Sequence, residues 1–207
     1  MTSSPFYRKL GLTAHITFSI GWFGAVAGFL ALALVSVNAL DSQLVRSSYL
    51  SMDLIAWFVI IPFCLGSLLT GVIQSLGTPW GLFKHYWVAV KLIMTIIGTI
   101  ILLAHMQPIS YLADVASKQV LTYSDLRGLR MRLIFDAGAA LLVLLGTITI
   151  SVYKPWGKTK YGLSNQNTKD VKAGINKPWG LYILLALISV IILLFIATHL
   201  IGGPNRH

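Results

Sequence analysis

Three histidines and one lysine interrupt long apolar segments of the sequence, at His15, Lys91, His105 and His199. Ionisable side chains are costly inside a membrane, and those found there usually face the interior of a helix bundle or a water-filled cavity. A neutral imidazole is a strong ligand for haem iron and for copper. These four residues are therefore candidate cofactor-binding residues, and His15, His105 and His199 are the candidate metal ligands.

The four residues form two pairs when they are placed by depth along their segments. His15 and Lys91 each lie about 7–9 Å from one end, and His105 and His199 lie near the other end. Lys91 and His105 are within about 40° of each other on one helical face, with Gly98 between them. Paired ligands at one depth, with a glycine that leaves space for a flat ring, are what a haem site in a bundle requires. Lys91 would then be the electrostatic partner of a haem propionate; in the alternative, its amine extends to the membrane surface and binds nothing.

Transmembrane helices are the elements that must position these side chains. Of the 207 residues, 56% are hydrophobic and 11% are charged, whereas a soluble domain has about 25% charged residues. Five apolar runs are long enough to cross a bilayer, at about 10–37, 54–76, 86–105, 133–153 and 179–201. We predict an all-α fold, a polytopic integral membrane bundle of five transmembrane helices that forms a single domain over residues 1–207. Residues 107–131 are expected to form a long outer loop with room for a short surface helix.

Acidic and sulfur-containing side chains exclude several other kinds of site. All six acidic residues are aspartate, and only Asp136 lies within an apolar run, which argues against a hydrolase that works through carboxylates. Asp136 follows Arg132 by four residues, so an ion pair between them is expected. Cys64 is the only cysteine, which excludes an internal disulfide and a thiolate metal cluster.

The basic residues indicate an orientation in the membrane. The formal net charge is +10, and apart from Lys91 the lysines and arginines divide nine to six between the two sides. The side with more positive charge is expected to be cytoplasmic, which places the N-terminus and the 154–178 loop in the cytoplasm and the C-terminus outside. The motif Pro-Trp-Gly recurs three times at span ends that this topology places on one side. We attribute the positive charge to topology and anionic lipid, and expect no nucleic-acid partner.

Small residues in the first span suggest a close helix contact. Gly21, Gly24 and Gly28 lie on one face, and the sequence GAVAG at 24–28 is a pattern suited to helix packing in membranes. This face would contact either another helix of the same bundle or a second copy of the chain in a homo-oligomer.

Two segments resemble a known group of proteins. LTAHITFSIGWFGAV in the first span and HYWVAVKLIMTIIGTIILLAH in the third are similar to the copper-resistance D type superfamily of small bacterial integral membrane proteins, which includes relatives of the membrane protoporphyrinogen oxidase and many uncharacterised members. The matching residues are His15, Trp22, Gly24, Val90, Lys91 and Leu92. The resemblance implies a b-type haem for which His15 and Lys91 are important, or copper uptake across the membrane, and a location in the bacterial inner (plasma) membrane.

The predicted function is that of a membrane protein that binds b-type haem in its helix bundle and has a redox role, with a membrane redox partner. His15 is the first-choice ligand, and His105 with His199 is the alternative pair. A second hypothesis is a copper or small-cation permeation protein that uses the same histidines as transient sites. A third is a membrane subunit or scaffold without a cofactor. No catalytic residue is assigned.

Overall fold

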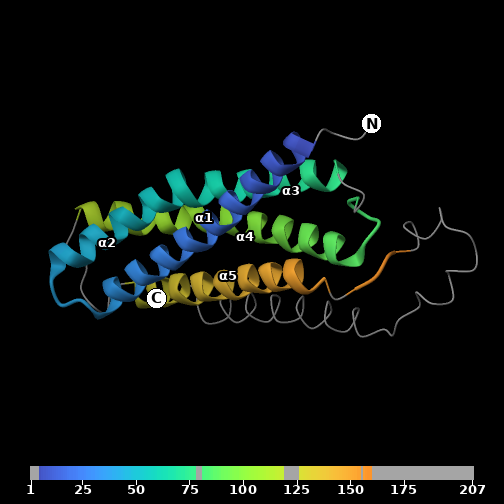
Figure 1. The fold of residues 1–207 in the computed structure, drawn as a ribbon. Coiled ribbons are helices and arrows are strands. Elements are labelled where there is room, and N and C mark those ends of the chain that lie inside the picture. Colours follow the sequence, from blue (N-terminus) through green and yellow to red (C-terminus); the bar gives the residue numbers. More distant parts are fainter. Residues whose placement is uncertain (1–4, 78–80, 119–125, 155, 160–207) are drawn as a thin grey trace, which may run out of the picture.

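Long helices account for nearly all of the chain that the structure describes. The computed structural model describes residues 5–77, 81–118, 126–154 and 156–159, and the architecture is that of these residues. The elements are α1 (Pro5–Asn38), α2 (Ser42–Ile55), the π-helix η1 (Ala56–Ile60), α3 (Ile61–Leu76), α4 (Tyr86–Lys118) and α5 (Arg127–Tyr153) (Figure 1). The prediction of an all-α fold is confirmed for this part of the chain.

Four helical units in the described residues are long and apolar enough to cross a membrane: α1, the continuous rod Ser42–Leu76, α4 and α5. They contain the first four predicted spans, while the fifth, at 179–201, and with it His199, lies outside the described residues. A helix of 33 to 35 residues is about 50 Å long, against about 30 Å for the hydrocarbon core of a bilayer. Three of the helical units are therefore longer than such an apolar layer is thick.

The extra length lies in segments that the sequence assigned to loops. Residues 42–53 are helical, and α4 continues through Pro108 to Lys118, so the first twelve residues of the predicted loop at 107–131 extend the third span and do not form a separate surface helix. Both extensions are amphipathic: α2 buries Val45, Ser48, Tyr49 and Met52, and α4 buries Ile109, Leu112, Ala113 and Ala116. The two extensions pack against each other, and this contact stabilises them as helices without a continuous apolar run.

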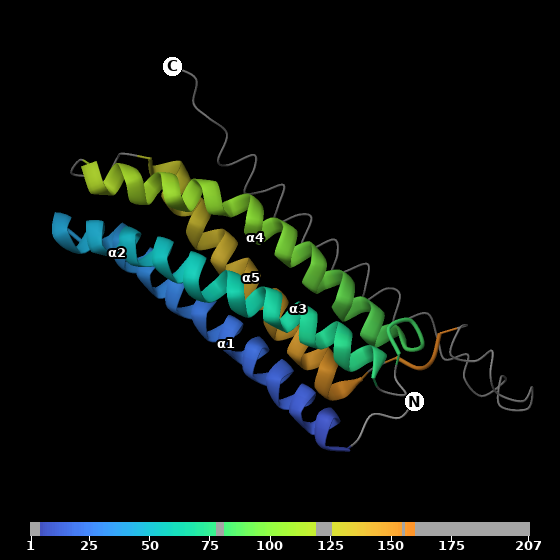
Figure 2. The same ribbon diagram turned by 90° about the horizontal axis from the view of Figure 1, so that it is seen from above.

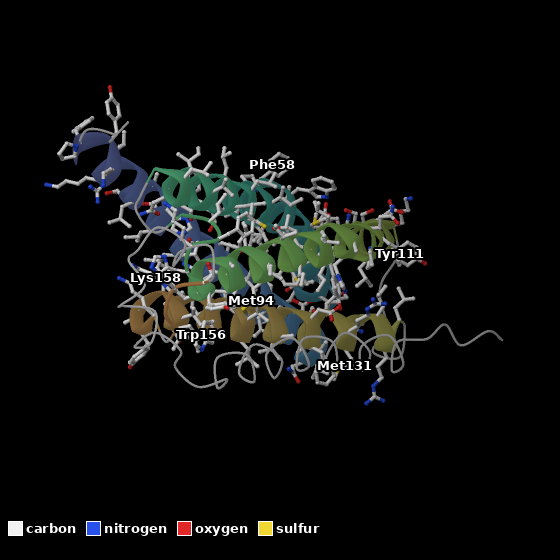
Figure 3. The ribbon with its side chains drawn as sticks, turned by 90° about the vertical axis from the view of Figure 1, so that its right-hand side faces the viewer. Phe58, Met94, Tyr111, Met131, Trp156 and Lys158 are labelled. Atoms are coloured by element: carbon white, nitrogen blue, oxygen red, sulfur yellow. The ribbon has the colours of Figure 1, made fainter. Side chains whose placement is uncertain are left out.

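The four helical units form a bundle in the cyclic order α1, α3, α4, α5. Helix α1 packs against α2 and α3 on one side and α5 on the other, and α4 packs against α2, α3 and α5 (Figures 1 and 2). Cys64 is fully buried and its Sγ lies 3.1 Å from Thr99 Oγ1, which agrees with a packing role. Met94 lies between α4 and α5 (Figure 3).

The second helical rod changes its winding where a proline removes a hydrogen-bond donor. In a regular helix the carbonyl of Phe58 would accept from the backbone N–H of residue 62, which is proline and has none. The backbone adopts five π-helical residues, Ala56–Ile60, directly before this point. Ala56 and Ile60 are buried there, so the helix accommodates Pro62 through a local π-helix inside a continuous rod.

At the end of the bundle that carries the N-terminus, the segments that follow the first two Pro-Trp-Gly motifs meet. His85 and Lys158 form an antiparallel bridge, and the backbone N–H of Thr159 donates to the carbonyl of Lys84 at 2.9 Å. Figure 3 shows Trp156 and Lys158 at this end. The third motif, at 178–180, lies outside the described residues.

Helices α1 and α3 approach closely through glycine, at Gly21 of the predicted glycine face and at Gly66 on α3, whereas the two glycines of GAVAG take no part. A methyl group on Gly66 would lie 2.5 Å from Phe18 Cδ1, and one on Gly21 would lie 3.0 Å from Phe63 Cε1. Gly24 and Gly28, by contrast, have open space within 4 Å among the described residues. The close contact is thus made by glycine on one helix against phenylalanine on the other.

This contact predicts that Gly66→Ala lowers the free energy of unfolding by about 1–3 kcal/mol, because the Phe18 ring must move to admit the methyl group. Gly24→Ala is the matched control and is expected to leave stability unchanged or slightly raised, since alanine is the better helix former. Thermal unfolding of both variants in one detergent measures the difference. Equal melting temperatures would contradict the close contact between Phe18 and Gly66.

Candidate functional site

A large cavity runs along the interior of the bundle. Its volume is about 970 Å³, which is at the upper end of the range for ligand sites in proteins, and α1, α3, α4 and α5 all contribute to its wall. Three of the four candidate residues line it, namely His15, Lys91 and His105. Candidate side chains that lie far apart in the sequence therefore share one cavity.

His15 is held by α3 through one of its ring nitrogens. Its Nδ1 lies 3.1 Å from the carbonyl oxygen of Ser67 and 3.2 Å from Thr70 Oγ1. A carbonyl oxygen can only accept, so Nδ1 carries the proton and Nε2 carries the lone pair. Gly71 lies under the ring, with the position of a missing Cβ 3.1 Å from His15 Cε1. This arrangement is the one that orients a metal-binding histidine in other proteins.

Lys91 lies at a similar depth on the facing helix α4. Its Nζ donates to the Ser151 hydroxyl on α5, and Ser151 in turn donates to the carbonyl of Thr147 at 3.0 Å. The side chain is half-buried and lines the cavity. Lys91 therefore lines the cavity with its amine bound to a hydroxyl two residues before the end of α5, and the alternative of an amine at the membrane surface stays open.

His105 has contacts at both of its ring nitrogens. Nδ1 donates to the carbonyl of Ile101 at 2.7 Å, and Nε2 lies 2.8 Å from Asp136 Oδ2. Arg132 Nε lies 3.6 Å from the same oxygen, so the ion pair expected from the sequence is present and the histidine joins it. His105 is buried, and its imidazole serves as the partner of a carboxylate, with neither nitrogen directed to a ligand.

The end of the cavity that holds His15 and Lys91 is far from the end that holds His105. Lys91 and His105 are separated by fourteen residues of α4, which corresponds to about 21 Å along the helix. His15 and His105 therefore cannot ligate one metal atom together. The partner proposed for His105, His199, lies outside the described residues.

Some residues of the site were missed by sequence reasoning. Ser67, Thr70 and Gly71 belong to a small polar stripe in the second span, which is a weak sequence signal, whereas the Ser151 hydroxyl had no signal at all. Polar groups of these kinds are common in helices. Whether one of them meets His15 or Lys91 depends on the rotation of its own helix, α3 or α5, about the helix axis. Asp136 was assigned to Arg132 because the two are one turn apart, and its contact with His105 crosses between helices.

The His105–Asp136 contact predicts a measurable coupling between the two side chains. Asp136→Leu is expected to lower the free energy of unfolding by about 3 kcal/mol, because a buried ion pair loses one partner. Adding His105→Leu should restore part of this loss. Asp114→Ala breaks the exposed pair with Lys118 and, as the control, should cost less than about 1 kcal/mol. Additive effects of the two leucine substitutions in a double-mutant cycle would show that the pair does not interact.

The sequence matches no protein-family model, no curated protein and no solved structure. The function must therefore be inferred from the site itself.

Proposed function

We propose that the chain is an integral membrane protein that binds b-type haem in the interior cavity, with His15 as an axial ligand, and takes part in electron transfer. The observation that carries this proposal is the Nδ1 hydrogen bond from His15 to the Ser67 carbonyl. Because Nδ1 is protonated, Nε2 keeps its lone pair and is the ring atom that can bind a metal. The His15 side chain lines a cavity of about 970 Å³.

The other residues around His15 fit a haem in their chemistry. Lys91 supplies a cation at the same depth for a propionate, and Gly71 lets the imidazole pack directly against α3. Ser67 and Thr70 hold the ring in one tautomer, and most of the cavity wall is apolar. Haem itself supplies reversible one-electron chemistry, with a potential that axial ligands and burial adjust. The resemblance of the first and third spans to the copper-resistance D type superfamily supports the same proposal.

Haem is better supported by the side chains than a copper ion is. In the described part of the chain, no group of three or more His, Cys, Asp or Glu side chains is placed to hold a metal ion. A protein site for a single copper ion needs several such ligands, whereas haem brings four nitrogens of its own and needs only axial ligands. We therefore propose haem ahead of copper permeation and ahead of a cofactor-free scaffold.

We also propose the bacterial inner membrane as the location, with the N-terminus in the cytoplasm and a fifth span at 179–201. The excess of lysine and arginine on the N-terminal side supports this orientation. Alkaline phosphatase fusions after residue 40 and after residue 207 should be active, and a fusion after residue 158 should be inactive.

The test of haem binding is an absorption spectrum of the detergent-purified protein from haem-sufficient cells. We expect a Soret band in the oxidised protein and a sharp α-band after reduction with dithionite. A colourless protein that also fails to take up added haemin would refute the proposal.

A further inference from the structure

The interior cavity reaches the surface of the bundle between α1 and α5. Five aliphatic side chains line the cavity and are also exposed: Leu12, Ile16, Ile20, Ile148 and Val152, with 37 to 69% of each surface accessible. The first three are one turn apart on α1 and the last two are one turn apart on α5, so each set forms a stripe along its helix. We call the gap between these stripes the α1–α5 opening.

The opening exists because α1 and α5 contact each other at one end and diverge at the other. At the end near Asn38 the two helices are joined by Arg130, which donates to the carbonyl of Ser36. Toward the N-terminus α1 moves away from α5 and continues beside α3 (Figure 1). The side chains between them in this half are aliphatic and exposed, whereas Ala33 and Ala137 in the other half are buried.

Three cations line the cavity at the end that carries the N-terminus, two on α1 and one after α5, where Lys154 Nζ also lies 5.8 Å from the centre of the Trp87 ring. Arg8 and Lys9 lie in the second turn of α1, Lys154 follows α5, and all three are exposed and line the cavity. Asp136 is the only acidic residue in the described lining, and it lies at the opposite end of the cavity. This end of the cavity therefore has a strong positive field beside an apolar entrance.

We propose that the α1–α5 opening binds an anionic phospholipid from the adjoining leaflet, with its phosphate at Arg8, Lys9 and Lys154 and one acyl chain inside the cavity. Phosphate oxygens match clustered basic side chains, and basic residues at a membrane surface attract anionic lipids. An acyl chain matches the aliphatic stripes, which would otherwise leave the cavity open at the side. Lipid binding here does not require haem, because His15 and Lys91 lie deeper than the three cations.

Native mass spectrometry of the full chain tests this binding directly. The detergent-purified protein is incubated with mixed micelles that contain either phosphatidylglycerol or phosphatidylcholine, which carry the same acyl chains. We expect the protein to retain about tenfold more phosphatidylglycerol, since each basic residue contributes to the attraction. Added inorganic phosphate should not displace the lipid, because phosphate alone lacks the acyl chain.

Two sets of variants, each with its control, distinguish the contribution of the basic side chains to lipid binding from that of the apolar α1–α5 opening. Arg8→Gln with Lys154→Gln should remove most of the preference, whereas Lys84→Gln with Lys158→Gln, which lie at the same end and do not line the cavity, should preserve it. Ile16→Trp fills the opening without a change of charge and should reduce retention. Ile93→Trp is its control, because Ile93 is exposed to the same degree, 44% against 46%, and lies outside the cavity.

Two results would overturn the proposal. Equal retention of the two lipids would show that the cations do not select the headgroup. Absence of retained lipid in a folded protein would show that the opening is covered in another way, by residues 160–207 or by a second copy of the chain. The absorption spectrum reports haem separately, so failure of either proposal can be recognised without the other.

Discussion

Replacing His15 with alanine is expected to abolish the Soret band of the purified protein. The Nε2 lone pair of His15 is the proposed axial ligand, and alanine offers no substitute on the α1 side of the cavity. Lys91 alone is a poor replacement, because an ammonium group has no lone pair until it loses its proton. Haem content per protein, measured after extraction, should fall at least tenfold, whereas the elution volume in size-exclusion chromatography should stay the same.

Two other histidines provide controls for this loss. His85→Ala removes an imidazole outside the cavity wall and should leave haem content unchanged. His105→Ala removes a cavity residue whose two nitrogens already contact Ile101 and Asp136, and it should also retain haem. If His105→Ala loses haem and His15→Ala keeps it, the ligand assignment is wrong and the pair formed by His105 and His199 becomes the better hypothesis.

Arg130→Ala is expected to produce the largest loss of stability in the described residues, about 3–5 kcal/mol. Arg130 is buried, with 4% of its surface exposed, and it connects three helices. Its Nε donates to Tyr49 Oη on α2 at 2.6 Å, its Nη2 donates to the Ser36 carbonyl on α1, and its guanidinium lies 5.7 Å from the centre of the Tyr49 ring. Hydrogen bonds to a charged group contribute about 1.5–3 kcal/mol each. Alanine would also leave the two acceptors without this donor.

Thermal and chemical unfolding in detergent measure this effect, with Arg127→Ala as the matched control. Arg127 begins the same helix and is exposed, so its replacement should change stability by less than about 0.5 kcal/mol. Tyr49→Phe removes one acceptor and keeps the ring, and it should cost about 1–2 kcal/mol. A loss for Arg130→Ala no larger than that for Arg127→Ala would be inconsistent with a buried connection between three helices.

Apolar runs predict where the first four spans lie but not where their helices end. The runs at 10–37, 54–76, 86–105 and 133–153 each lie within a helical unit of the structure. Residues 42–53 and 106–118 have too many polar side chains to form an apolar run, and they are helical because Tyr49, Met52 and Leu112 are buried between them. That burial depends on contact with another part of the chain, which hydropathy along one segment does not register.

For the candidate site, the sequence predicts the position of each side chain along its helix but not the polar group that the side chain contacts. Counting residues placed His15 and Lys91 at one level, and both line one cavity at the same end. The rotation of each helix about its axis decides which polar group a side chain meets, and it is fixed by contacts such as that of Phe18 with Gly66. The Ser67 carbonyl at His15 and the Asp136 carboxylate at His105 depend on that rotation, so neither could be assigned from one sequence.

The π-helix at Ala56–Ile60 adds one residue to the helical rod Ser42–Leu76 and so sets the rotation of α2 about the helix axis relative to α3. Deleting one residue there would restore regular α-helical winding and turn all of α2 by about 100° relative to α3. Asp53 would then face away from Ser110, with which it now shares a hydrogen bond of 2.6 Å, and Tyr49 would face away from Arg130. A single-residue deletion at this position should therefore be as damaging as the loss of Arg130, even though Tyr49 and Asp53 themselves are retained.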